Sequence, residues 1–332
     1  MIENYAAVYF NRARQIMLAE APGKMVTMQV FQKNEAVLCG IDEVVTLLQQ
    51  QTNGLGIKSL SDGDHIAPLE PVLEIIGPYA EFAHLESVYL GILAQQTKVA
   101  TNMSNVVTAA AGKPVLFFGD RFDNFANQVN NGYAAYVGGA NGFATQAMVS
   151  KFNGEATGTM PHALIAAFDG DVVAASRAFR KHFPDVPLIA LVDFNNDCVT
   201  DSIRCLDAFG KDLAGVRLDT SEKLIDTSLE LAAKAHSLDI DSPARWQGVC
   251  PALVNNVRQG LDRYGGQHVK IVVSGGFTAN KVRAFESGSV PVDVYAVGSS
   301  IIQGSNDFTA DIVRPTVKVG REYRDSSRLV AR

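Results

Sequence analysis

Charged and small polar residues follow several short apolar runs of this sequence at the point where each run ends. Asp193 and Asn195 follow LIALV, Arg217 and Asp219 lie at the end of GVRLD, and the loops SGGF and VGSS follow VKIVV and VYAV. Carboxylates can hold sugar hydroxyls, or a magnesium ion through water. Glycine loops let backbone N–H groups approach an anion closely. These residue types together predict a site for a phosphorylated sugar.

The two glycine loops are the expected phosphate site. SGGF contributes Ser274, Gly275 and Gly276, and VGSS contributes Gly298 and Ser299. Glycine and serine also make plain tight turns, so either loop alone is weak support. Because the loops end consecutive strands, the position at which βα barrels commonly hold phosphate, we favour the phosphate interpretation.

The acidic residues and the arginine have structural alternatives that the sequence leaves open. Asp193 and Asp219 could cap the helices that follow them. Arg217 lies two residues before Asp219 on the same face of its strand, so the two could form a simple ion pair. An arginine inside a buried strand needs an anionic partner of some kind.

His162, in EATGTMPHALIAAF, is a further candidate. We expect it to begin a helix, with Thr159 as a possible cap and Pro161 in the first turn. A histidine at a helix start can be purely structural, and its position beside an anion-favouring helix end is what suggests chemistry.

The elements that must position these residues form an alternating strand and helix pattern. We expect strands at Leu188–Phe194, Val216–Leu218, Val269–Val273 and Val292–Val297, too apolar to alternate and therefore buried on both faces. Ser221 is expected to cap one intervening helix, Pro251 to begin another that Gly265 closes, and Thr278 to cap a third before Gly288. The pattern predicts an α/β barrel or a doubly wound sheet.

Composition restricts the class of protein. The chain has 332 residues, 47% of them hydrophobic, and a net charge of −6, which gives no broad cationic surface for nucleic acid. No apolar run approaches the roughly 20 residues of a membrane span, and the first residues lack a secretory signal, so we expect a cytoplasmic protein without a membrane partner. The four cysteines form no CxxC pair and are expected to be reduced and buried.

Several blocks of the sequence resemble nicotinate phosphoribosyltransferases, members of the type II phosphoribosyltransferases. They are HLESVYLGILAQQTKVAT, AAGKPVLFFGDR, YVGGANGFATQAMVSKFNGEATGTMPHALI, GVRLDT, HVKIVVSGGF and DVYAVGSS. The GTMPH block followed by RLD, SGG and VGSS distinguishes this family from quinolinate phosphoribosyltransferases, which share the fold but typically lack that histidine.

The resemblance implies a discontinuous N-terminal α/β sandwich, residues 1–110 joined by 306–332, and an irregular, TIM-like α/β barrel at 111–305. It also implies a homodimer or larger homo-oligomer with active sites at subunit interfaces. The reaction would join nicotinate to 5-phosphoribosyl 1-pyrophosphate (PRPP), giving nicotinate mononucleotide and pyrophosphate, with Mg²⁺ as cofactor and ATP as co-substrate.

The resemblance also implies roles for individual residues. Asp193 and Asp219 would hold the ribose and metal region, and Arg217 anionic substrate groups. His162 matches the histidine that is phosphorylated from ATP in the family. The residues implied to bind substrates are Tyr9, Phe10, Arg121, Thr159, Asn195, Ser274, Gly275, Gly276, Gly298 and Ser299.

Two departures from the family pattern concern recognition of the pyridine carboxylate. Phe122 follows Arg121 where the family usually has a second arginine, and Ala7-Val8 replaces the acid often found before the Tyr-Phe pair. Other acceptors therefore stay open: nicotinamide, quinolinate or a related heteroaromatic compound. A non-catalytic barrel that only binds a phosphosugar is a further alternative.

Overall fold

The chain folds into two compact units in the computed structural model, which describes residues 2–52, 54–236, 246–316 and 318–332. The first unit comprises residues 1–104, 133–139 and 302–332, and the second comprises residues 105–132 and 140–301. The C-terminal tail therefore returns to the unit formed by the start of the chain. Among the described residues, no helix combines the length and apolar character that a membrane span needs.

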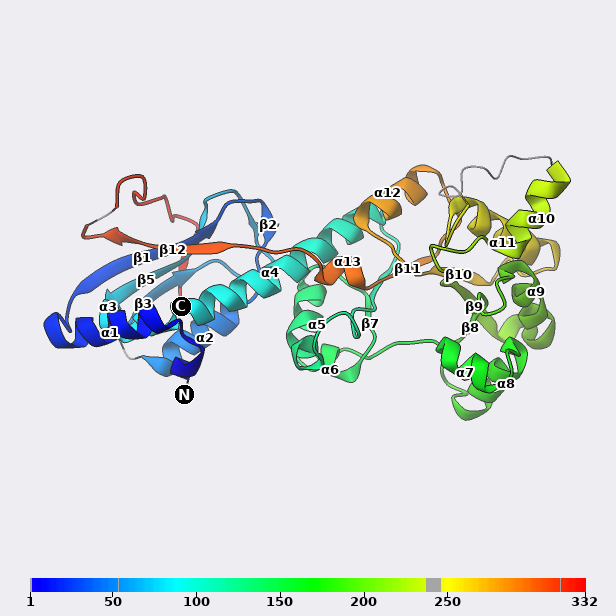
Figure 1. Cartoon of the computed structure of the whole chain (residues 1–332), viewed down its shortest axis with the longest axis horizontal. Coiled ribbons are helices and arrows are strands. Elements are labelled where there is room, and N and C mark those ends of the chain that lie inside the picture. Colours follow the sequence, from blue (N-terminus) through cyan, green and yellow to red (C-terminus); the bar gives the residue numbers. More distant parts are fainter. Residues whose placement is uncertain (1, 53, 237–245, 317) are drawn as a thin grey trace. The chain divides into compact units, whose positions relative to one another are not determined.

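An antiparallel sheet forms the frame of the first unit (Figure 1). Its strand order is β12-β1-β5-β3-β13. The elements of this unit are η1 (Ile2–Tyr5), α1 (Val8–Glu20), β1 (Met25–Gln32), β2 (Ala36–Val37), α2 (Ile41–Gln51), β3 (Gly56–Ser59), β4 (His65–Ile66), β5 (Pro71–Pro78), α3 (Tyr79–Phe82), η2 (Ala83–Leu85), most of α4 (Glu86–Ala109), β12 (Phe308–Arg314) and β13 (Val330–Ala331).

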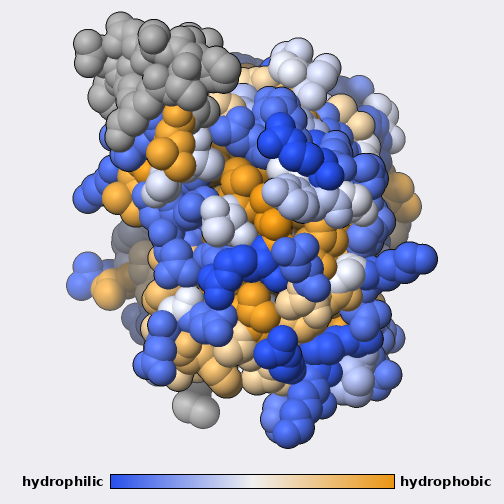
Figure 2. All heavy atoms as spheres, turned by 90° about the vertical axis from the view of Figure 1, so that its right-hand side faces the viewer, coloured by the Kyte–Doolittle hydropathy of each residue, from blue (hydrophilic) through white to orange (hydrophobic). Residues whose placement is uncertain are grey.

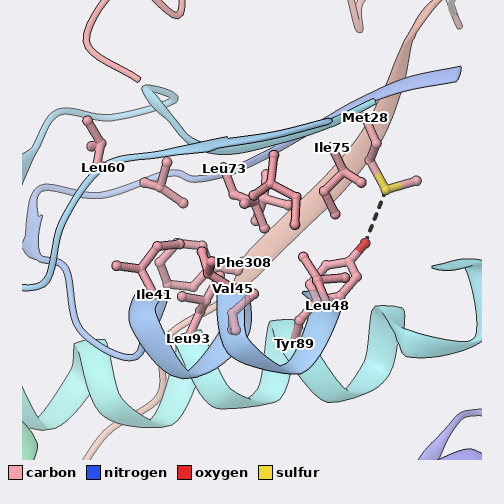
Figure 3. Close-up of a cluster of buried hydrophobic side chains, with 14 of the residues drawn as sticks. Met28, Ile41, Val45, Leu48, Leu60, Leu73, Ile75, Tyr89, Leu93 and Phe308 are labelled. Atoms are coloured by element: carbon pink, nitrogen blue, oxygen red, sulfur yellow. Dashed lines mark hydrogen bonds between the residues drawn. The ribbon is translucent and has the colours of Figure 1, made fainter. Parts of the chain in front are cut away.

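The core of the first unit lies between this sheet and the helices α2 and α4. Figure 3 shows Leu73 and Ile75 of β5 facing side chains of both helices, among them Leu48 and Leu93. The four residues are almost fully buried, which removes their apolar surface from water. The long helix α4 follows the β-rich start of the sequence because its apolar side packs on this sheet and completes the core.

A six-stranded parallel sheet forms the centre of the second unit, in the order β7-β6-β11-β10-β9-β8. The elements are β6 (Val115–Phe117), η3 (Phe125–Asn127), α5 (Gln128–Val137), β7 (Gly142–Phe143), α6 (Gln146–Val149), α7 (His162–Ala167), α8 (Val172–His182), β8 (Leu188–Leu191), α9 (Cys198–Phe209), η4 (Gly210–Asp212), β9 (Leu213–Leu218), α10 (Thr227–His236), α11 (Pro251–Arg263), β10 (Lys270–Val273), α12 (Ala279–Ser287), β11 (Val294–Val297) and α13 (Ser299–Ile302).

The α/β class is confirmed, whereas closure of the barrel is not. Within the described residues, β7 and β8 are the two edges of the parallel sheet and do not pair with each other. Helices α8 and α9 pack against β8 and β9. Figure 2 shows hydrophilic and hydrophobic residues mixed over the face of the molecule that lies on the right in Figure 1. The sheet therefore has the arrangement of an open half-barrel.

The helix caps and helix starts agree with the sequence prediction at some helices and differ from it at others. Thr278 caps α12, since its side chain accepts a hydrogen bond from the N–H of Lys281, and Pro251 begins α11, as expected. Ser221 does not cap the helix that follows β9, because that helix, α10, begins six residues later at Thr227. All four cysteines are free and buried, which confirms the expectation of reduced thiols.

Candidate active site

A cavity of about 550 Å³ lies entirely within the second unit. Loops at the carboxyl ends of β6, β9, β10 and β11 surround it, the edge at which α/β folds bind ligands. The lining residues are Phe118, Asp120, Arg121, Phe122, Ala144, Thr157, Gly158, Thr159, Met160, Pro161, His162, Ala163, Arg217, Asp219, Ser274, Gly275, Gly276, Phe277, Ala296, Gly298 and Ser299.

Arg217 is the centre of a hydrogen-bond network in this cavity. Its Nε donates to Oγ of Ser274 at 3.0 Å, its Nη1 to Oγ1 of Thr159 at 3.1 Å, and its Nη2 to Oδ2 of Asp219 at 3.0 Å. The side chains of Arg217 and Asp219 are 15% and 16% exposed. The ion pair that the sequence left open is therefore present, and it still leaves this arginine facing the cavity.

Ser274 connects the same network to the glycine loop. Its Oγ lies 2.8 Å from Oδ1 of Asp219, so both oxygens of that carboxylate have partners. The guanidinium of Arg217 also lies over the ring of Phe118, 5.4 Å from its centroid. Asp219 is thus held in one orientation by side chains from two neighbouring strands, and it does not cap a helix.

The SGGF loop has the backbone geometry of an anion site. Gly275 and Gly276 adopt φ angles of 84° and 66°, which side chains with a Cβ rarely tolerate. Within the described part of the chain, the N–H groups of both glycines donate to no protein acceptor. Successive unpaired N–H groups form a concave cradle for an anion.

The VGSS loop is closely packed against Phe118 and Phe122 where it borders the cavity. A Cβ placed on Gly298 would lie 2.3 Å from the carbonyl oxygen of Phe118 and 2.6 Å from Cε2 of Phe122. Only glycine fits there without displacing backbone. Gly298 precedes α13 and Ser299 is its first residue, and both line the cavity together with the SGGF loop.

His162 and Asp193 form an ion pair at the edge of the cavity. Nε2 of His162 lies 2.9 Å from Oδ2 of Asp193, with side chains 43% and 6% exposed. The hydrogen bond to Asp193 raises the pKa of His162 above its usual value, and partial burial opposes that change. Because Nε2 faces the carboxylate, the neutral form of the ring that keeps its proton on Nε2 has a lone pair on Nδ1.

The caps expected near these residues differ from those observed. Thr159 does not cap α7, whose N-cap is Pro161, and it bonds Arg217 instead. Asp193 does not cap α9, because Asp197 does so. The helix-capping role that was the structural alternative for Thr159 and Asp193 is therefore absent, and the proposed roles in the site remain.

The other oxygen of Asp193 is informative about a metal. Oδ1 of Asp193 is buried and has no hydrogen-bond partner among the described residues. The described chain also contains no cluster of three or more His, Cys, Asp and Glu side chains suited to enclose a metal. Mg²⁺ is usually held by one or two carboxylates together with substrate phosphates and water. Asp219 lines the cavity and Asp193 does not, so Asp219 and the unpaired oxygen of Asp193 behind His162 fit magnesium bound with a phosphorylated substrate.

Three of the expected substrate-binding residues do not line the cavity. Asn195 donates to the carbonyl of Gly170 and to Asp201, which gives it a structural role in the loop after β8. Tyr9 and Phe10 lie on α1 in the first unit, with ring centroids 4.3 Å apart, and Tyr9 is 64% exposed.

Sequence reasoning missed the aromatic and acidic residues of the loop after β6. Phe118 and Asp120 line the cavity together with Arg121 and Phe122. They follow Val115–Phe117, a short apolar strand whose carboxyl end meets the same sheet edge as those of β9 to β11. Applying the strand-end rule to this run as well would have found them.

Comparisons with known proteins agree with this geometry. Residues 7–97 match the family model "Quinolinate phosphoribosyl transferase, N-terminal domain". The chain is 30% identical to a nicotinate phosphoribosyltransferase of Mycobacterium tuberculosis over 79% of its own length and 53% of the relative. It is 31% identical to the solved nicotinate-nucleotide pyrophosphorylase from Pyrococcus furiosus, covering 96% of this chain and 78% of that one with a TM-score of 0.82.

The chain belongs to the nicotinate phosphoribosyltransferase family. The solved human nicotinic acid phosphoribosyltransferase, at 15% identity and a TM-score of 0.70 over 97% of this chain, shares the fold. The chain spans about half the length of the curated nicotinate phosphoribosyltransferases that it matches.

Proposed function

We propose that this protein transfers the phosphoribosyl group of PRPP to nicotinate, giving nicotinate mononucleotide and pyrophosphate for NAD biosynthesis. The observation that carries the proposal is the cavity in which two glycine loops, Arg217 and Asp219 meet at the ends of β9, β10 and β11. The relatives from Mycobacterium tuberculosis and Bacillus subtilis, which are named nicotinate phosphoribosyltransferases, support it.

Different residues of the chain bind different parts of the substrate. The unpaired N–H groups of Gly275 and Gly276, with those at Gly298 and Ser299, receive the 5-phosphate. Asp219 lies beside them, with its carboxylate fixed by Arg217 and Ser274, where ribose hydroxyls can donate to it. Arg121 adds a second guanidinium to the cavity for anionic substrate groups.

Departure of pyrophosphate leaves positive charge on the ribose ring. Fixed carboxylates near that ring favour the charged transition state, and arginines stabilise the negative leaving group. Asp193 and Asp219 would hold Mg²⁺, in part through water, and the ion would supply further neutralisation of the leaving group's charge. The pyridine nitrogen already has a lone pair, so the chain needs no nucleophilic serine or cysteine.

ATP is proposed as a co-substrate that acts through His162. With its Nε2 proton directed to Asp193, the ring can offer the Nδ1 lone pair to a phosphoryl group. Phosphorylation there would add negative charge at the edge of the anion site and so couple ATP hydrolysis to substrate binding or product release.

Four further proposals concern the barrel, the oligomeric state, the cellular location and the role of Tyr9 and Phe10. The parallel sheet belongs to an irregular, TIM-like barrel. The protein acts as a homodimer or larger homo-oligomer in the cytoplasm, and Tyr9 and Phe10 contribute to the nicotinate site across the interface. The exposure of Tyr9 supports the last point, since a large ring in contact with water is available to a partner subunit.

Quinolinate is the second candidate acceptor. The family model matched by residues 7–97 carries the quinolinate name, and Phe122 alters the loop that follows β6. A panel of nicotinate, nicotinamide and quinolinate with PRPP and Mg²⁺ decides between them. Nicotinate must have the highest kcat/KM, and a higher value for another acceptor would replace nicotinate in this proposal.

A further inference from the structure

The SGGF loop is held from outside the cavity by a lysine in an unusual place. Lys281 lies in the first turn of α12, where the helix dipole disfavours a positive charge. Its side chain runs back along the loop: Nζ lies 3.5 Å from the carbonyl oxygen of Gly275 and 4.5 Å from the ring centroid of Phe277. Burial lowers the pKa of this ammonium below its usual value. A cation kept in such surroundings needs compensating partners.

Glu222 supplies a compensating negative charge. The carboxylate of Glu222 raises the pKa of Lys281, against the larger effect of burial. Glu222 also contacts the loop itself, since a Cβ placed on Gly276 would lie 1.8 Å from its Oε1. The two side chains therefore hold adjacent glycines of one loop.

The position of these side chains fixes the direction of the loop's N–H groups. In a trans peptide the carbonyl oxygen and the next N–H point to opposite sides. Lys281 contacts the oxygen of Gly275 and does not line the cavity, so the N–H of Gly276 is directed away from Lys281. Both glycines have positive φ and would otherwise sample many conformations.

We propose that Lys281 and Glu222 are positioning residues that hold Gly275 and Gly276 in the conformation that binds the 5-phosphate of PRPP. This inference rests on the proposed function, which assigns that phosphate to the SGGF loop. Neither residue touches substrate, and both act through the backbone of the loop.

Kinetics of Lys281→Met and Glu222→Gln test the proposal. We expect Lys281→Met to raise the KM for PRPP by about tenfold or more, while kcat and the KM for nicotinate stay within about twofold. Lys281→Arg should recover most of the PRPP affinity, because it keeps the charge. Lys223→Met removes a lysine beside Glu222 that is exposed and should leave all three constants unchanged. A wild-type KM for PRPP in Lys281→Met overturns the proposal, as does a fall in kcat alone.

The pairing of the two residues has its own test. Adding Glu222→Gln to Lys281→Met should raise the KM for PRPP less than Glu222→Gln does alone, because the residues act on one loop. Independent, additive effects contradict the paired arrangement. If Lys281→Met does not fold, as judged by circular dichroism, Glu222→Gln decides: a raised KM for PRPP supports the inference and an unchanged one overturns it.

Calorimetry with inorganic phosphate separates this inference from the proposed function. If wild-type protein transfers no phosphoribosyl group, the proposed function fails, but phosphate binding still reports on the loop. Weaker phosphate binding by Lys281→Met than by wild type then supports the positioning role. Equal binding, or no binding by wild type, overturns it.

Discussion

Nε2 of His162, the first residue of α7, lies 2.9 Å from Oδ2 of Asp193, which follows β8. The two residues are 31 positions apart, and the parallel arrangement brings them together at one sheet edge. Asp193 fixes the ring orientation of His162 through this bond, while its own Oδ1 is buried with no partner in the described chain. This hydrogen bond and this unpaired oxygen are the two observations on which the proposed phosphorylation of His162 and the proposed magnesium binding rest.

Substituting the histidine should separate ATP stimulation from basal transfer. His162→Ala removes the nitrogen proposed to accept a phosphoryl group but leaves Arg217, Asp219 and both glycine loops in place, so ATP should no longer accelerate turnover while much of the basal rate remains. Initial rates with and without ATP measure this effect. His182→Ala, at an exposed histidine that ends α8, is the control and should retain stimulation. Equal ATP stimulation in His162→Ala would refute the role.

Replacing Gly298 tests the tight approach of the second glycine loop. Gly298→Ala places a methyl group 2.3 Å from the carbonyl oxygen of Phe118, so the loop must move, at a cost of about 1–3 kcal/mol in the free energy of unfolding. The KM for PRPP should rise with it. Gly91→Ala is the control, because nothing lies within 4 Å of its added methyl in α4 and alanine favours helices. An unchanged KM in Gly298→Ala would remove this loop from the phosphate site.

Arg217 should be needed for both stability and catalysis. Arg217→Met leaves Asp219 without its cation, which should lower the free energy of unfolding by about 3 kcal/mol in urea titrations. The kcat/KM for PRPP should fall by about a hundredfold or more. Arg217→Lys keeps the charge but cannot donate to Thr159, Ser274 and Asp219 together, so it should recover only part of each loss. Full activity in Arg217→Met would contradict the network's role.

Glu86 in the first unit should make stability depend on pH. Burial, and then the charge of Asp311, raises the pKa of Glu86 to about 7 in the folded protein. From about pH 4.5 to 7 the unfolded chain holds this carboxyl ionised while the folded chain keeps it neutral, so its contribution to stability falls as pH rises through that window. Glu86→Gln should therefore raise the melting temperature at pH 8 and change it little at pH 4.5.

The exposed Glu35 provides the matched comparison for that measurement. Glu35→Gln removes one charge of the same sign from the surface and should give no gain that grows between pH 4.5 and 8. A gain of equal size in both variants would show that net charge, and not burial of Glu86, causes the effect.

The strand-end rule predicted most of the cavity, because parallel strands bring their carboxyl ends to one edge whatever their separation in sequence. Arg217, Asp219 and both glycine loops were identified in this way. Thr159 was expected as a helix cap, but a hydroxyl near a long arginine side chain can bond that arginine instead, and sequence spacing does not reveal such a partner. Lys281 was not foreseen at all, since its contact runs backwards from a helix to the loop before it.

The extent of the sheet was harder to predict than its class. Continuous apolar runs identified the strands β8 to β11, but pairing at the sheet edges depends on strands as short as Gly142–Phe143, which give almost no hydrophobic pattern. Asn195 shows a related limit, because its position after a strand placed it near the site while its amide bonds the neighbouring loop. Strand ends thus predict the neighbourhood of a side chain better than its direction.

Product analysis with radiolabelled nicotinate tests the central claim most directly. Purified protein is incubated with PRPP, Mg²⁺ and the labelled acid, and both products are quantified. The account predicts nicotinate mononucleotide and pyrophosphate in equal amounts, at a rate that falls sharply in Arg217→Met. Intact PRPP that raises the melting temperature of the protein, with no pyrophosphate from any acceptor, would contradict the account and identify a phosphosugar-binding protein without transferase activity.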